Sequence, residues 1–468
     1  MTALVRTRHV LALAAAVAAQ AQTAPAAAPA RPAYVAYDTA AIALTHAKVI
    51  DGSGAPARAD QTIVIAGGKI AALGAAKDVK IPAGALVLDM TGKTVIPGII
   101  GLHDHMYYSG RMQFATYPRL FLASGITTIR TTGSIDPYQE LNLREAIQAG
   151  KVPGPEVIPT GPYLEGKNGL RWARPLNTPE DARRVVRYWS EEGITWFKAY
   201  TQITNAELAA AIDEAHKHGM KVTAHLCSVG FREAVADGID NLEHGLFVNT
   251  EFWPGKQPDV CPTVGDSAMF FSLDIKSADV QRTIQEMVSH HVAMTSTLAV
   301  FELSSPSRVP LDERVYAALA PDFATRVRAW YDSAKTQNDA AHRMTIKKAM
   351  EFERAFVAAG GLLGAGSDPC CLTEIAGYGD QRNFELLVEA GFPPEQVVQI
   401  MTLNGAKILG MADRTGSIAA GKQADLVVLA GDPTKNAGEI KNVVTVFRLG
   451  VGYDPKQLLV PVLGNVGR

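Results

Sequence analysis

The sequence contains few cysteines and no surplus of either charge. Its four cysteines are too few for a framework of disulfides, although they allow one bridge, and the sequence does not decide which. Lys and Arg number 45 against 47 Asp and Glu, so the formal net charge is only −2. Neither nucleic acid nor an anionic membrane is therefore expected as a partner, and a small molecule is favoured.

Long apolar runs are also missing, since none reaches the roughly 18 uninterrupted apolar residues that a membrane helix requires. Residues 1–21 combine two arginines, a short apolar run and the small-residue sequence Ala19-Gln20-Ala21, which together are typical of a secretory signal peptide. Residues 22–36 are rich in Ala and Pro and are expected to form a flexible leader. These features predict an exported protein, periplasmic or secreted.

Short β-rich runs separated by turn residues lie near both ends of the chain, between residues 42 and 90 and again in ADLVVLAGDP and NVVTVFRLG. We expect the two ends, residues 37–93 and 409–468, to pair into one small β-sandwich, with a tail at the C-terminus.

Residues 94–408 alternate short apolar strands with amphipathic helices, which is typical of a parallel α/β barrel. The predicted strands are 94–105, 125–133, 156–164, 194–201, 221–227, 241–245, 292–300 and 362–368. The helices between them include 178–192, 204–218 and 277–290. Eight strands predict a (β/α)8 TIM barrel. The long connections 246–291 and 301–361 are expected to shape a substrate pocket.

The most specific local motif is His103-Asp104-His105 at the end of the first predicted barrel strand. Because residues i and i+2 of a strand point to the same side, both imidazoles are expected to face the barrel mouth, while Asp104 points away. Two neutral imidazole nitrogens in this arrangement can bind one metal ion.

Three further residues of ligand type end later strands: His225, His244 and Asp368. Catalytic residues of TIM barrels lie at the C-terminal ends of strands, so their coincidence with the His pair predicts a metal site. The alternative is a set of unrelated core histidines with a capping aspartate.

Lys198 ends the fourth predicted strand, where an ammonium group facing inward close to a metal would be strongly disfavoured. A neutral amine there can take up carbon dioxide, and the resulting carbamate is a carboxylate able to bridge two metals. The alternative is a lysine that forms a salt bridge at the rim.

These residues resemble the amidohydrolase superfamily, specifically its binuclear branch with a carboxylated lysine. The resemblance rests on VIPGIIGLHDH, FKAY, VTAHLC, LEHG, GAGSD and the segment from MTLNGAKILG to GKQADLVVLAGDP. Within the superfamily the sequence is most similar to the exported Xaa-Pro dipeptidase and ochratoxin A hydrolase group.

The resemblance implies one divalent metal, usually zinc, on His103, His105 and Asp368, and a second metal on His225 and His244, with carboxylated Lys198 between them. Two positions depart from the family pattern. Gly101 stands where many members have an Asp, so support for His103 must come from elsewhere. Cys227 stands where many dipeptidases have a Tyr, which affects substrate contacts.

The expected reaction is hydrolysis of an amide by a hydroxide held between the metals, with Asp368 passing a proton to the departing amine. The expected substrate is a dipeptide, an N-acyl amino acid or an ochratoxin-like N-aroyl phenylalanine. Tyr107, Tyr108, Lys167 and Arg171 follow the first and third strands and are candidates to contact it. Relatives imply a homo-oligomer such as an octamer. The alternatives are hydrolysis of a cyclic amide, imidazolone or lactone, and a non-catalytic assembly protein that retains the metal-binding barrel.

Overall fold

The computed structural model describes residues 31–262, 270 and 272–468. The predicted signal peptide and residues 22–30 of the predicted leader lie outside the described residues. Strand β1 (Val35–Tyr37) begins before the predicted end of the leader at residue 36, because it pairs with β19 (Val451–Tyr453). None of the described helices is long and apolar enough to cross a membrane.

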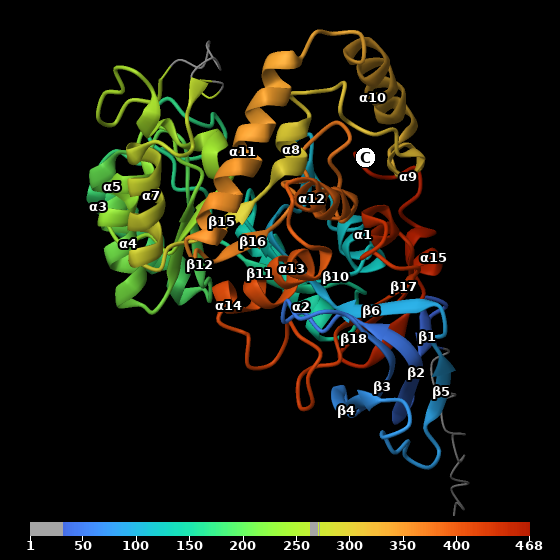
Figure 1. The fold of residues 1–468 in the computed structure, drawn as a ribbon. Helices are drawn as coiled ribbons and strands as arrows, with labels where there is room; N and C mark the ends of the chain where they lie inside the picture. The colour runs from blue at the N-terminus through green and yellow to red at the C-terminus, as the bar shows by residue number, and fades with distance from the viewer. Residues whose placement is uncertain (1–30, 263–269, 271) are drawn as a thin grey trace, which may run out of the picture. The chain divides into compact units, whose positions relative to one another are not determined.

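Segments from both ends of the chain form one nine-stranded sheet, drawn in blue and red in Figure 1. Besides β1 and β19, its strands are β2 (Ala41–Val49), β3 (Arg58–Ala66), β4 (Lys69–Ala75), β5 (Leu86–Asp89), β6 (Lys93–Pro97), β17 (Leu426–Ala430) and β18 (Val443–Arg448). Strand β17 pairs antiparallel with β6, and β2 pairs with β3, β5 and β6. Segments from the two ends of the chain therefore pair within one sheet.

The single strand predicted over 94–105 is wrong, because the structure divides it into β6 and β7 (Ile99–Asp104). Strand β6 belongs to the terminal sheet, whereas β7 pairs with β10 (Ile126–Thr131). The break falls after Pro97, which has no N–H to donate, at Gly98. A Cβ at Gly98 would lie 2.0 Å from Oγ1 of Thr127, so this close approach requires glycine.

Eight parallel strands follow one another in sequence order. They are β7, β10, β11 (Glu156–Pro159), β12 (Trp196–Ala199), β13 (Lys221–Ala224), β14 (Asn241–Glu243), β15 (Ala293–Ser296) and β16 (Leu363–Ala365). A parallel bridge between Thr160 and Trp196 connects the sheet of β7, β10 and β11 to the sheet of the other five. The N–H of Asp368 donates to the carbonyl of His103 over 2.8 Å, so the last strand returns to the first. The arrangement is TIM-barrel-like, and all eight predicted strand positions contain a barrel strand.

Helices follow most of these strands and lie outside them (Figure 1). They are α1 (Tyr117–Ala123), α2 (Pro137–Gln148), α3 (Pro179–Glu191), α4 (Asn205–Lys217), α5 (Phe231–Ala236), α7 (Ala278–Ser289), α11 (Ala340–Ala358), α12 (Tyr378–Glu389), α13 (Pro394–Gln399) and α14 (Gly405–Leu409). The three predicted helices correspond to α3, α4 and α7. Each begins after a residue whose hydroxyl oxygen accepts a hydrogen bond from a backbone N–H of the first turn; these residues are Thr178, Thr204 and Ser277.

The two long connections carry structure of their own. The connection predicted over 301–361 contains the end of α8 (Leu298–Glu302) together with α9 (Glu313–Ala318), α10 (Pro321–Ala334) and α11. The remaining smaller elements are β8 (Tyr107–Tyr108), β9 (Arg111–Met112), α15 (Pro455–Leu459), the 3-10 helices η1 (Gly245–Val248), η2 (Thr250–Phe252) and η4 (Ala437–Lys441), and the π-helix η3 (Ile400–Asn404). A disulfide joins Cys227, after β13, to Cys261 in the other long connection.

The return of β16 to β7 predicts that Gly366 tolerates no side chain. A Cβ there would lie 2.3 Å from the backbone nitrogen of His103, which cannot move aside as a side chain can. We expect Gly366→Ala to lower the free energy of unfolding in urea by about 1–3 kcal/mol, the usual cost of overpacking. Gly438→Ala is the control, because its Cβ would meet only side-chain oxygens at 3.3 Å or more. Equal stability of the two variants would contradict this account of the contact.

Candidate metal centre

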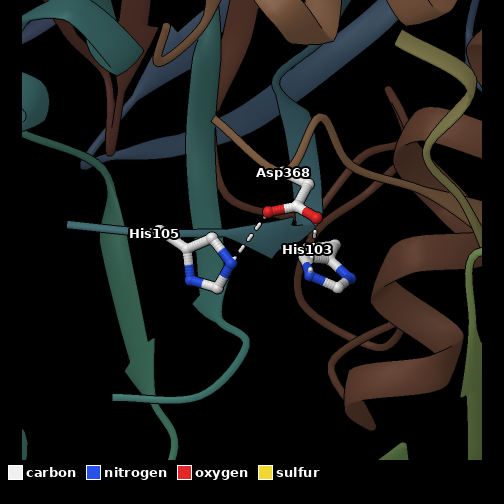
Figure 2. Close-up of side chains that lie close together, drawn as sticks. All are labelled: His103, His105 and Asp368. Atoms are coloured by element: carbon white, nitrogen blue, oxygen red, sulfur yellow. Dashed lines mark ion pairs between the residues drawn. The ribbon is translucent and has the colours of Figure 1, made fainter. Parts of the chain in front are cut away.

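Strand β7 presents His103 and His105 to a carboxylate that follows β16 (Figure 2). Nε2 of His105 lies 3.0 Å from Oδ1 of Asp368, and Nε2 of His103 lies 3.7 Å from Oδ2. One potential ligand atom from each of the three residues lies within 4.8 Å of the other two. The predicted convergence of these residues is therefore present in the structure.

His244 lies beside His103, and His225 lies beside His244. The imidazole centroids of His103 and His244 are 4.4 Å apart, and those of His225 and His244 are also 4.4 Å apart. Nε2 of His244 lies 4.0 Å from Oδ2 of Asp368 and has no hydrogen-bond partner in the part of the chain that the structure describes, while Nδ1 of His244 hydrogen-bonds to Thr297. The four histidines predicted as ligands thus form one continuous cluster with Asp368.

Two of these residues have a backbone conformation that side chains rarely adopt. The φ angle is +66° at His244 and +56° at Asp368. Left-handed φ is uncommon outside glycine, and such strained positions concentrate at functional sites. Since His244 leaves the extended conformation of β14, it and the preceding Glu243 both contact the His103 region, although neighbours in a regular strand point to opposite faces.

Lys198 on β12 is fully buried, and its Nζ has no hydrogen-bond partner among the described residues. Burial lowers the pKa of its ammonium group to about 8, although the charges of Glu243 and Asp368 act in the opposite direction. Burial lowers the pKa of His103 and His225, and the charge of Lys198 lowers both further, so the lysine lies within electrostatic range of the two imidazoles. A lysine that forms a salt bridge at the rim, the alternative raised above, does not describe this side chain.

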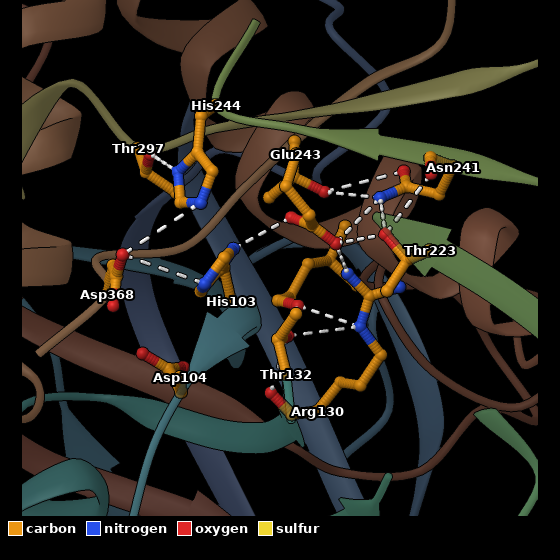
Figure 3. A network of polar contacts seen from close by, with 12 residues as sticks. His103, Asp104, Arg130, Thr132, Thr223, Asn241, Glu243, His244, Thr297 and Asp368 are labelled. Carbon is orange, nitrogen blue, oxygen red and sulfur yellow. Dashed lines mark hydrogen bonds and ion pairs between the residues drawn. The ribbon is translucent and has the colours of Figure 1, made fainter. Parts of the chain in front are cut away.

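Glu243 connects the cluster to the interior of the barrel (Figure 3). Its carboxylate accepts hydrogen bonds from Nδ1 of His103 at 2.8 Å and from the amide of Asn241 at 2.9 Å. Arg130, which is fully buried, and Thr223 donate to the same carboxylate. Sequence reasoning missed Glu243. The alternation of polar Asn241 and Glu243 on a short buried strand was the available signal.

Burial keeps three imidazoles of the cluster neutral, those of His103, His225 and His244. Burial holds the pKa of His103 and His244 well below the usual histidine value and lowers that of His225 to about 3. Burial alone would raise the pKa of Asp368, but His103 and His105 lower it below the ordinary aspartate range. Neutral imidazoles and an ionised carboxylate are the protonation states that bind divalent metals.

The structure accounts for the first departure from the family pattern. A Cβ at Gly101 would lie 1.8 Å from Oδ2 of Asp104, so the space beside Gly101 is already filled. Asp104 is buried there and accepts a hydrogen bond from the hydroxyl of Ser367. The support for His103 comes instead from Glu243, on a different strand.

The four predicted substrate contacts have different environments. Tyr107 stacks on His105 with centroids 4.6 Å apart, and its hydroxyl lies 3.0 Å from that of Tyr163. Tyr108 is fully buried and donates to the carbonyl of Leu372, so the prediction that it contacts substrate is not supported, because its hydroxyl is already bonded in the core. Lys167 and Arg171 are exposed on the loop after β11.

A cavity of about 370 Å³ is lined in part by Tyr163. It is lined by residues of the loop after β11 and of α3, among them Trp172, Arg174, Arg184, Tyr188 and Trp189. Tyr163 therefore contacts both the cavity and Tyr107, which stacks on the candidate ligand His105.

The model of the amidohydrolase family matches residues 94–452. Enamidase from Eubacterium barkeri is 24% identical over 404 residues, covering 82% of this chain and 84% of that protein. A solved Xaa-Pro dipeptidase with bound methionine superposes with a TM-score of 0.66 at 20% identity, covering 88% of this chain and all of the other. A. niger ochratoxinase superposes with a TM-score of 0.64 at 17% identity, covering 88% and 94%. At these identities the two structures establish a shared fold.

The role of Glu243 leads to a prediction for Glu243→Gln. The amide keeps the shape but removes the charge that faces Arg130 and orients His103, so we expect metal affinity to fall about 10–100-fold. Competition with a chromogenic chelator measures this affinity. Glu140→Gln is the matched control: Glu140 is buried elsewhere, and burial raises its pKa to about 8, so it is already mostly neutral at pH 7. Wild-type affinity in Glu243→Gln would refute this role.

Proposed function

The chain belongs to the amidohydrolase family, whose members are hydrolases that act on carbon–nitrogen bonds, and we propose that it is a binuclear metal-dependent enzyme that cleaves an amide to release an amino acid. The observation that carries the proposal is the convergence of four histidines, Asp368 and Lys198 at the C-terminal ends of barrel strands. We also propose that the strands close into a full (β/α)8 barrel, accompanied by a two-layer β-sandwich.

The donor set of the cluster fits two divalent cations. Buried polar atoms without partners are rare in proteins, yet Nζ of Lys198 and Nε2 of His244 both lack one within residues 31–262, 270 and 272–468. In the proposal His103, His105 and Asp368 would hold one ion, and His225 and His244 would hold the other, with carboxylated Lys198 as a further ligand. Zinc is the expected metal, because nitrogen and oxygen ligands suit it.

Bound divalent ions supply two effects: they lower the pKa of a water molecule and polarise an amide carbonyl. The remaining work falls to the side chains. Asp368 is ionised and lies 3.0 Å from His105, so it can accept the proton of the attacking water and deliver it to the departing nitrogen. His103 is held by Glu243 with Nδ1 as the donor, which leaves Nε2 free on the side of Asp368.

The surroundings of the cluster favour an amide with an aromatic or apolar group. Tyr107 forms one wall beside His105, and the cavity beside Tyr163 combines Trp172, Tyr188 and Trp189 with the cations Arg174 and Arg184. Such a lining suits a bulky acyl or side-chain group together with a carboxylate. An N-acyl amino acid, a dipeptide or an N-aroyl phenylalanine has this composition.

Export of the protein and its assembly complete the proposal. The disulfide between Cys227 and Cys261 is of a kind that persists in oxidising compartments, which supports periplasmic or secreted localisation and the signal peptide at residues 1–21. The homo-oligomer, such as an octamer, is carried over from the family resemblance.

Metal analysis of the purified protein and of a ligand variant tests the proposed centre directly. We expect purified protein to contain nearly two divalent ions per chain by elemental analysis, and His103→Ala to lose most of this metal together with amide hydrolysis. Metal affinity should fall by more than the roughly 10–100-fold caused by removing a group that supports a ligand, because this substitution removes a ligand itself. His216→Ala is the control, because His216 pairs with Asp240 and is largely exposed, away from the cluster. Undiminished hydrolysis in His103→Ala would exclude the proposed function.

A substrate panel separates the proposal from its alternatives. We expect N-acyl amino acids and dipeptides with an aromatic or apolar group to be hydrolysed, and cyclic amides, imidazolones and lactones to be poor substrates, with all activity abolished by a chelator and restored by zinc. Release of free amino acid, measured by chromatography, is the readout. Preferential opening of cyclic substrates would favour the alternative enzyme class, and metal binding without any turnover would favour the non-catalytic assembly protein.

A further inference from the structure

Two adjacent thiols lie beside the candidate centre and take no part in the proposed reaction. Cys370 and Cys371 follow Asp368 after a single proline, and both are partly exposed. Their Sγ atoms are 2.7 Å apart. A disulfide bond measures about 2.05 Å, so a small rotation of the side chains would bring the sulfurs to bonding distance.

Within the chain these thiols can pair only with each other. The sequence has four cysteines, and the other two, Cys227 and Cys261, already form a disulfide. That disulfide also indicates an environment in which thiols are oxidised. A second oxidised pair is therefore chemically compatible with the same compartment.

A bridge between neighbouring residues differs from an ordinary one. Consecutive Cα atoms across a trans peptide are about 3.8 Å apart, which is below the usual range of about 4.4–6.8 Å for bridged cysteines. The bond would consequently be strained, and strained, accessible disulfides are the ones that are readily reduced. Such a bridge suits a reversible change better than a permanent structural role.

The thiol pair lies in a loop that begins at Asp368 and is hydrogen-bonded to the hairpin that follows His105. The carbonyl of Cys370 accepts the N–H of Ser109 at 2.7 Å, and the carbonyl of Leu372 accepts the hydroxyl of Tyr108 at 2.8 Å. Both donors belong to the hairpin that begins with Tyr107, which stacks on His105. The same loop begins at Asp368, and both Asp368 and Leu372 have positive φ angles. A change at Cys370 and Cys371 would reach Asp368 and Tyr107 through these short connections.

We propose that Cys370 and Cys371 form a reversible vicinal disulfide that acts as a redox switch on the loop carrying Asp368, with the oxidised form holding metal less tightly. The effect on metal rests on the proposed function, whereas the bridge itself does not. The oxidant is a small-molecule disulfide of the glutathione type.

The reaction balances in two exchange steps. The thiolate of one cysteine attacks the small disulfide, forms a mixed disulfide and releases one small thiolate. The second cysteine, as thiolate, attacks the protein sulfur of the mixed disulfide, so that the bond between Cys370 and Cys371 forms and the second small thiolate leaves. Two electrons pass from the protein to the oxidant, and the two cysteine protons end on the two released thiols.

The test uses the full chain, loaded with zinc and incubated with oxidised glutathione. After free thiols are blocked with an alkylating reagent, we expect mass spectrometry to find the peptide containing both cysteines lighter by two hydrogen atoms and unalkylated, with reversal by mild reductant. In competition with a chelator, the oxidised form should bind zinc about tenfold more weakly than the reduced form. This is the lower end of the effect of disturbing a group that supports a metal ligand.

The double variant Cys370→Ser with Cys371→Ser is the control. It should retain zinc equally well before and after oxidation, and circular dichroism should match that of the reduced wild type. Alkylation of both cysteines after oxidation, or two bound glutathiones, would overturn the bridge. A bridge that leaves zinc retention unchanged would overturn the switch. A reduced protein that never binds zinc would contradict the proposed function instead, and the mass measurement would then decide the bridge alone.

Discussion

The buried carboxylate of Glu243 is the contact on which the arrangement of the centre depends. It accepts hydrogen bonds from His103 on β7 and from Arg130 on β10, so one side chain on β14 joins the sixth barrel strand to the first two. Arg130 also donates to the carbonyl of Leu102 and lies over the ring of Trp196. Removing one partner of a buried ion pair typically costs about 3–5 kcal/mol, so these residues hold one another in place.

This ion pair also fixes how the histidine is presented. Because Nδ1 of His103 points at Glu243, Nε2 is left on the side of Asp368, where a ligand nitrogen is needed. His244 and Asp368 reach the same point from strand ends with left-handed backbone. Such conformations cost of order 1–3 kcal/mol each and persist where the surroundings enforce them. The hydrogen bond of Asp368 N–H to the carbonyl of His103 and that of His244 to Thr297 provide this enforcement.

Features that follow from local patterns were predictable from the sequence. Alternating apolar strands and amphipathic helices located every barrel strand, and the strand-end positions identified His225 and His244 as neighbours of His103. Features that depend on contacts across the fold were not. The strand break at Gly98 depends on its close approach to Thr127 on β10. Buried Tyr108 is hydrogen-bonded to the carbonyl of Leu372, which is distant in sequence. The partner of Cys227 was equally undetermined, because any of the cysteines could have been brought to it by the long connections.

The charges of the cluster link carboxylation of Lys198 to metal binding. Glu243 is already paired with Arg130. The neighbouring imidazoles of His103 and His225 are neutral, so they do not balance the charges of Lys198 and Asp368. A protonated Lys198 without a hydrogen-bond partner would be costly to bury, and the neutral amine still leaves a buried polar atom unpaired. Conversion to a carbamate removes the unpaired amine but adds an anion close to Asp368. Two anions among neutral imidazoles repel each other unless cations lie between them. Under the proposed function, carboxylation and metal binding therefore stabilise each other, and neither is favourable in this cluster alone.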